Sequence, residues 1–199
     1  MNVCICGWYY HKPFIKVMNQ SMTLMNDIIV IGHTDGDAGN LQKIIIPNVG
    51  LEFGAYDFYL KNIWQGGDTL FIHDDTEFEF TAWNKVNLLP QLFDQVFIHE
   101  NGIAELANGF AHGRAFFCSN RFLKRLKTDD GFWYAKEQIV IENEISKNEK
   151  EHNRGIKSFL CYCLKIKAET GWAVAQVVNI PEIKTGWRGR YLNFKPDRG

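Results

Sequence analysis

Residues 68–78, Asp-Thr-Leu-Phe-Ile-His-Asp-Asp-Thr-Glu-Phe, decide how the rest of the chain is interpreted. Residues 69–72 have the aromatic and β-branched character of a buried strand, which stops abruptly at His73, Asp74 and Asp75. In open α/β sheets, ligands bind just outside the carboxyl ends of the strands. Adjacent carboxylates repel each other unless a positive charge lies beside them, and Mg²⁺ or Mn²⁺ prefers such oxygen ligands. The stretch therefore predicts a divalent-metal site, against the alternative of a solvated acidic turn that caps the next helix.

The composition of the whole chain limits the class of protein to which it can belong. Its 199 residues, 46% hydrophobic and 23% charged, predict one globular domain over residues 1–199. The net charge of −1 gives no general attraction to nucleic acid or anionic membranes. We expect no membrane-spanning run and no signal peptide. The five cysteines lack zinc-site spacing, which predicts reduced, buried thiols in a cytoplasmic protein.

Apolar runs that fit strands alternate along the chain with patterns that fit helices. We expect strands at 3–6, 27–33, 43–48, 69–72, 94–99, 114–119 and 172–180, and helices at 14–25, 48–64, 83–92, 120–127 and 133–152, the last stopped at Gly155, with a helix or strand at 159–166. Short links between such elements predict an α/β three-layer sandwich with a mostly parallel central sheet. Right-handed crossovers then bring several strand ends to one rim.

Three motifs in this order resemble nucleotide-sugar glycosyltransferases of the GT-A fold. They are PNVGLEFGAYDFYLKNI at 47–63, FIHDDTEF at 71–78 and HGRAFFCSNRFLKRL at 112–126, and the resemblance covers roughly residues 2–145. The first motif is also similar to one in a group of bacterial and fungal glycosyltransferase-like proteins. The chain is shorter than many such enzymes, so the acceptor-binding part is minimal or supplied by a partner.

The resemblance implies a Rossmann-like nucleotide-sugar-binding half over 1–80, and an acceptor-side half with a C-terminal tail over 81–199. The implied reaction transfers a sugar from a nucleoside diphosphate sugar to a glycan, lipid-linked, small-molecule or modified-nucleobase acceptor. Mn²⁺ or Mg²⁺ would neutralise the diphosphate leaving group. Asp75 matches the last acidic position of the family's Asp-x-Asp pattern and is the first choice for the metal ligand. His73 occupies the first position and Asp74 the middle one, which leaves open whether either binds the metal or the ribose.

The resemblance also places the nucleoside over the ends of the first strands. Trp8 or Tyr9 stacks on the base or instead covers the sheet edge. His33, Asp35 or Asp37 lies near the base and ribose. Gly50 allows close backbone approach or only serves a turn. The predicted nucleotide-sugar-binding residues are Cys6, Gly7, Trp8, His33, Asp35, Asn48, Gly50, Glu52, Asp74, His112, Arg114, Arg188 and Arg190. The planar fork of an arginine suits a diphosphate, although the interleaved aromatic and basic tail also suits a nucleic-acid strand.

An inverting transferase needs a base to take the proton of the acceptor hydroxyl, whereas a retaining one does not. The candidates are Glu100, Asp130 and Glu137, and the resemblance favours the last two; each is alternatively an ordinary surface carboxylate. Two other functions remain open. One is a metal-dependent phosphodiester or phosphate hydrolase, which needs more carboxylates on the same rim. The other is a non-catalytic nucleotide-binding partner subunit.

Overall fold

A seven-stranded sheet forms the centre of the protein in a computed structural model that describes residues 1–99, 114–129, 132 and 147–185. Its strands lie in the order β3-β2-β1-β4-β7-β6-β8. Their bounds are β1 Asn2–Gly7, β2 Asp27–Gly32, β3 Gln42–Ile45, β4 Thr69–His73, β6 Gln95–Ile98, β7 Ala115–Cys118 and β8 Gln176–Val178. Strand β7 is antiparallel to β4 and β6, and the other pairs are parallel. The predicted mostly parallel sheet is confirmed.

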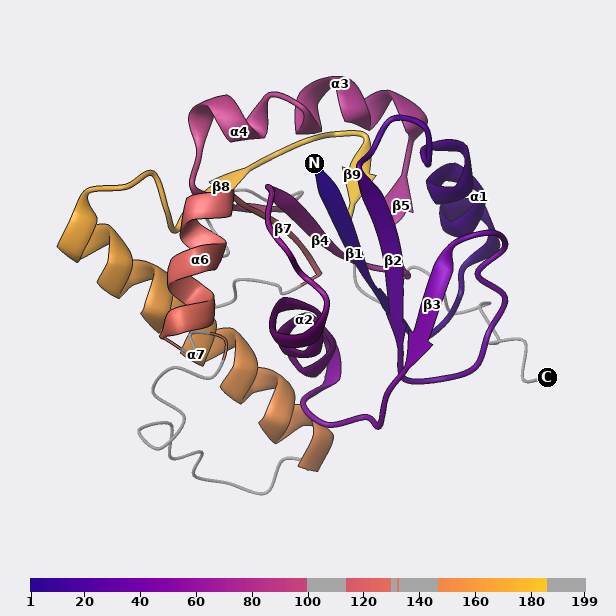
Figure 1. Ribbon diagram of the computed structural model, residues 1–199, viewed down its shortest axis with the longest axis horizontal. Helices are drawn as coiled ribbons and strands as arrows, with labels where there is room; N and C mark the ends of the chain where they lie inside the picture. Colours follow the sequence, from indigo (N-terminus) through magenta and orange to yellow (C-terminus); the bar gives the residue numbers. More distant parts are fainter. Residues whose placement is uncertain (100–113, 130–131, 133–146, 186–199) are drawn as a thin grey trace.

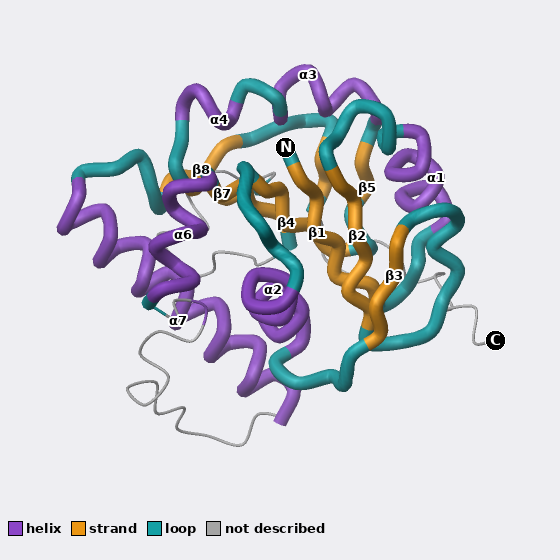
Figure 2. Tube along the Cα trace, viewed as in Figure 1, coloured by secondary structure: helices purple, strands orange, loops and turns teal. Residues whose placement is uncertain are grey.

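Helices cover both faces of this sheet (Figure 1). One face carries α2 Leu51–Asn62, α6 Asn120–Thr128 and α7 Lys147–Thr170. The other face carries α1 Lys12–Gln20, the 3₁₀ helix η1 Phe80–Ala82, α3 Trp83–Val86 and α4 Leu89–Leu92. A two-stranded sheet of β5 Glu77–Phe78 and β9 Ile183–Lys184 lies on the same side as α1 (Figure 2). The predicted three-layer α/β/α sandwich is confirmed.

Alternation along the strands divides the core in two. In β1, Val3 and Ile5 pack toward α1, whereas Cys4 and Cys6 pack toward α2 and α7. The α2–α7 side is aromatic: Phe71 and Phe116 stack with ring centroids 4.9 Å apart. Burying one such ring contributes roughly 1.5–3 kcal/mol, so this layer fixes the strands on which the rim residues sit.

Helix α7 differs from the prediction, because it runs through Gly155 to Thr170. Its buried residues Phe159, Tyr162, Cys163 and Ile166 recur every three or four positions, and packing of that stripe outweighs the helix cost of a glycine. All five cysteines are free thiols and four are buried. The exception is Cys161, which two residues of helix place on the opposite side from Cys163. No helix in the described ranges combines the length and apolarity needed to cross a membrane.

The PNVGLEFG motif forms a tight entry to α2. Gly50 precedes the helix with φ of 81°, and Leu51 also has a positive φ of 51°. A Cβ on Gly54 would lie 1.7 Å from the carbonyl oxygen of Val49, so the entry loop packs directly on the helix backbone. Both glycines are therefore required by backbone geometry.

We expect Gly54→Ala to destabilise the protein by about 1–3 kcal/mol, because overpacking against a carbonyl outweighs the ~1 kcal/mol that Ala gains over Gly in a helix. Urea unfolding measures the change. Asn62→Ala, at the exposed end of the same helix, is the matched control and should not destabilise. A Gly54→Ala protein as stable as the wild type would contradict this account of the motif.

Candidate functional site

The predicted site residues of the first strands meet on one rim of the sheet. Strand pairing sets Cys6 of β1 beside His73 of β4. Because β7 runs the other way, its start lies at this same rim, and the backbone N–H of His73 donates to the carbonyl of Arg114 over 2.7 Å. His33 follows β2, the other neighbour of β1. The ends of the parallel strands β1, β2 and β4 therefore share one edge, as predicted, and the start of the antiparallel β7 joins them there.

Asp74 is tied to the loop that follows β1. Its side chain is fully buried, and its Oδ2 accepts the backbone N–H groups of Trp8, Tyr9 and Tyr10 over 2.8, 2.7 and 2.6 Å. Its own N–H donates to the carbonyl of Cys6 over 3.1 Å. Burial raises the pKa of Asp74, whereas the His73 imidazole and the loop N–H groups act to lower it. One carboxylate oxygen of Asp74 is thus fully occupied by the backbone of the β1 loop.

His73 lies between Cys6 and the two aspartates. Its Nδ1 is 2.8 Å from Oδ1 of Asp75 and 3.3 Å from Oδ1 of Asp74, contacts that favour a protonated nitrogen. The same nitrogen is 3.3 Å from the backbone N–H of Asp75, a contact that needs a bare nitrogen. Because the contact with Asp75 Oδ1 is shorter than the contact with the Asp75 N–H, we assign a proton to Nδ1 of His73. Burial lowers the pKa of His73, but Asp75 and Cys6 raise it, and the net pKa is well above its ordinary value.

The thiol of Cys6 does not act as a nucleophile of this cluster. Cys6 is 1% exposed, and burial raises its pKa to about 11, against a smaller lowering by His73. The thiolate is the reactive form of cysteine, so a buried thiol with a raised pKa is inert. Cys6 is a packing partner of His73.

Asp75 stands between two cationic groups. Its Oδ1 contacts His73, and its Oδ2 is 3.4 Å from Nη1 of Arg114. Among the described residues, His, Cys, Asp and Glu side chains form no group of three or more that could hold a metal ion. Oδ2 of Asp74 is taken by the loop, and its Oδ1 is buried 3.3 Å from the protonated His73. Asp75 is partly exposed, so it is the one of the three predicted ligands that a metal ion could reach.

An aromatic wall flanks this acidic end. The rings of Trp8 and His33 meet edge to face with centroids 5.8 Å apart, and Tyr9 lies 6.0 Å from His73. His33 Nε2 is 2.8 Å from the carbonyl oxygen of Leu51, so that nitrogen donates and the strained entry to α2 is tied to the end of β2. The wall thus joins β1, β2 and α2.

Gly7 is the last residue of β1, and the other predicted site residues fall into three groups. Gly50 and Glu52 are buried at the start of α2, where a carboxylate interacts favourably with the helix dipole. Asn48 is exposed, and Asp35 is exposed and paired with Lys43 over 2.6 Å. Six predicted residues lie outside the described part of the chain: Glu100, His112, Asp130, Glu137, Arg188 and Arg190.

The β1 loop is the feature that sequence reasoning missed. The Tyr10 hydroxyl donates to the carbonyl of Thr34 over 2.7 Å, and the Thr34 hydroxyl donates to the carbonyl of Trp8 over 2.8 Å. These contacts pin the loop to the end of β2. The pairing of β1 with both β2 and β4 brings this loop against Asp74, and that pairing has no signal in the sequence.

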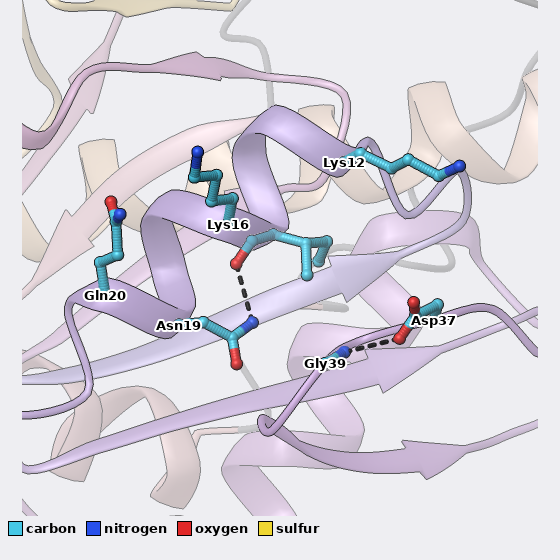
Figure 3. Close-up of a pocket in the computed structure, with 7 residues that line it drawn as sticks. Lys12, Lys16, Asn19, Gln20, Asp37 and Gly39 are labelled. Atoms are coloured by element: carbon cyan, nitrogen blue, oxygen red, sulfur yellow. Dashed lines mark hydrogen bonds between the residues drawn. The ribbon is translucent and has the colours of Figure 1, made fainter.

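A groove of about 440 Å³ lies away from these strand ends, between α1 and the β2–β3 loop (Figure 3). Lys12 and Lys16 project from α1 on one side, and Asp37 lies on the other. Asn19 fixes the groove wall by donating to the carbonyl of Ile15 over 2.8 Å. Asp37, the alternative to Asp35 near the base and ribose, lines it, whereas the rim residues Trp8, His33 and Asp74 do not.

We expect the free energy of unfolding to fall as pH rises above about 6.5, the ordinary pKa of histidine. The folded-state pKa of His73 is raised, so its contribution is complete below the unfolded-state pKa and is lost as pH rises through the folded-state pKa. Urea unfolding in metal-free buffer across this range measures it. Asp75→Asn should weaken the dependence, and His11→Gln, at the N-cap of α1, should retain it. An unchanged pH slope in His73→Gln would refute this assignment.

No family model and no curated protein sequence matches the chain. A TarS structure from S. aureus aligns with 90% of the chain at a TM-score of 0.50 and 11% identity, and the match spans 57% of the TarS chain. An active-site mutant of LgtC aligns with 90% of the chain at a TM-score of 0.50 and 9% identity, over 72% of its own chain. A further structure, of the galactosyltransferase LgtC in complex with donor and acceptor sugar analogs, gives a TM-score of 0.48 at 10% identity, over 90% of the chain and 73% of its own. At identities of 9–11%, structural similarity shows the fold alone. The chain has a GT-A-like fold, which is the fold class that its motifs predict.

Proposed function

We propose that the protein transfers a sugar from a nucleoside diphosphate sugar to a hydroxyl-bearing acceptor. The observation that carries this proposal is the joining of the Trp8–Tyr10 loop to the acidic end of β4 on one rim. An aromatic wall for a nucleoside and a charged end for a diphosphate then lie side by side, at the place where open α/β sheets bind ligands. The GT-A-like fold supports the same conclusion.

Each part of the rim has a role in this proposal. Trp8 and His33 would contact the nucleoside, since their rings already meet edge to face. Arg114 would bind diphosphate oxygens, because its guanidinium lies beside Asp75 and its planar fork matches phosphate geometry. Neutralising the leaving diphosphate is the main electrostatic demand of glycosyl transfer.

The metal requirement belongs to the proposal as well, with Asp75 as the ligand and His73 beside it. Bound Mn²⁺ or Mg²⁺ would supply positive charge to the leaving diphosphate. The acceptor belongs to one of four classes: a glycan, a lipid-linked sugar, a small molecule or a modified nucleobase. Glu100, Asp130 and Glu137 stay the predicted bases for an inverting reaction.

We expect Asp75→Asn to lower Mn²⁺-dependent affinity for a nucleoside diphosphate at least about tenfold, while the fold is retained, because a neutral amide is a weaker metal ligand than a carboxylate. Isothermal titration of UDP, GDP, ADP and CDP and their hexose conjugates, with Mn²⁺ or with EDTA, measures the affinity. Release of free nucleoside diphosphate from the bound sugar nucleotide measures turnover.

Asp27→Asn, an exposed aspartate at the start of β2 on the opposite edge of the sheet, is the matched control and should bind as the wild type does. Equal affinity in Asp75→Asn and the wild type would argue against the assignment of Asp75. Hydrolysis of simple phosphodiesters, without any turnover of sugar nucleotides, would favour the hydrolase instead.

A further inference from the structure

The Trp8–Tyr10 segment presents three consecutive backbone N–H groups to one point. Such a concave row of N–H groups is an anion-binding arrangement, of the kind that holds phosphates in other folds. Here the anion is internal: all three groups donate to Oδ2 of Asp74 over 2.6–2.8 Å. A diphosphate therefore cannot occupy this row while Asp74 is in place, and its binding place moves to the Asp75 and Arg114 side of the rim.

The position of Asp74 is itself fixed from two directions. Its backbone N–H donates to the carbonyl of Cys6, the last residue of β1 but one, and the N–H of His73 just before it donates to the carbonyl of Arg114. Because these two bonds fix the backbone of Asp74, the position of the Asp74 carboxylate sets the position of the loop. The restraint acts across 64 to 66 residues of sequence.

The loop in turn carries the surface that a nucleoside would meet. Trp8 lies against His33, and the Trp8 carbonyl is held by the Thr34 hydroxyl. The Trp8 N–H donates to Asp74 and the Trp8 carbonyl accepts from the Thr34 hydroxyl, so the Trp8 backbone is held in one orientation. Ligand affinity rises when a binding surface is already ordered, because no ordering cost remains to be met on binding.

We propose that Asp74 is a positioning residue that locks the Trp8–Tyr10 loop as a preformed nucleoside platform, and that it does not serve as a metal ligand. This inference rests on the proposed function for the identity of the ligand. It assigns different tasks to the two adjacent aspartates: Asp74 orders the nucleoside end of the site, and Asp75 acts at the diphosphate end.

The test compares Asp74→Asn, Asp74→Ala and the Asp27→Asn control. The amide of Asn keeps the shape of the side chain but loses the charge that strengthens hydrogen bonds from N–H groups. Ala removes the hydrogen-bond acceptor altogether, and the Asp74→Ala variant is compared with the wild type only if it folds. Hydrogen–deuterium exchange of the peptide that contains residues 8–10 reports on the loop directly and needs no ligand. Turnover of the sugar nucleotide preferred by the wild type gives KM and kcat, and titration with Mn²⁺ alone gives the metal affinity.

We expect Asp74→Asn to speed exchange at residues 8–10 and to raise KM about tenfold, with kcat and Mn²⁺ affinity within about twofold of the wild type. Unchanged exchange at the loop would overturn the inference. So would a lowered kcat with unchanged KM, or a loss of Mn²⁺ affinity, since either places Asp74 in the reaction itself.

The failure of the proposed function would look different. In that case the wild type would bind and turn over none of the sugar nucleotides, while the exchange of residues 8–10 would still respond to Asp74→Asn. That outcome would support the ordering of the loop by Asp74 and would contradict the role of the loop as a nucleoside-binding surface.

Discussion

The acceptance of three backbone N–H groups by one buried carboxylate oxygen is the interaction on which the functional rim depends. Moving a carboxylate out of water costs several kcal/mol unless hydrogen bonds and charges compensate. Asp74 meets that condition through Trp8, Tyr9, Tyr10 and the neighbouring His73. Without these bonds, the loop after β1 would keep its ties to the end of β2, but its backbone N–H groups would lose their shared acceptor at the end of β4.

Charge at the rim is balanced by side chains in the described part of the chain. Asp74 and Asp75 both lie within 3.3 Å of His73 Nδ1, and Arg114 approaches Asp75 from the other side. A cation entering at Asp75 would therefore compete with two positive side chains, so metal affinity and the protonation of His73 are linked. The same two side chains give the site positive charge of its own beside the proposed diphosphate position.

The sequence predicted those parts of the fold that hydrophobic periodicity and turn-forming residues specify. The apolar run before His73 specified β4, and the PNVGLEFG motif specified the start of α2, because Gly50 and Gly54 meet backbone constraints that other residues cannot. Strand direction was not specified in this way: β7 is fully buried, as the parallel strands β1 and β4 of the same sheet are, so its pattern carries no sign that it runs the other way. Strands β5 and β9 have two residues each, too few to show a period.

The sequence by itself determined that a buried strand ends in a histidine followed by two acidic side chains, and it predicted a ligand-binding rim there. It did not determine which residue has which task, because Asp74 and Asp75 are chemically identical and adjacent. Only the tertiary structure separated them: pairing of β1 with β4 brings the Trp8–Tyr10 loop to Asp74, and the reversed β7 brings Arg114 to Asp75. The role of a carboxylate is set by the donors around it, and here those donors come from segments far away in the chain.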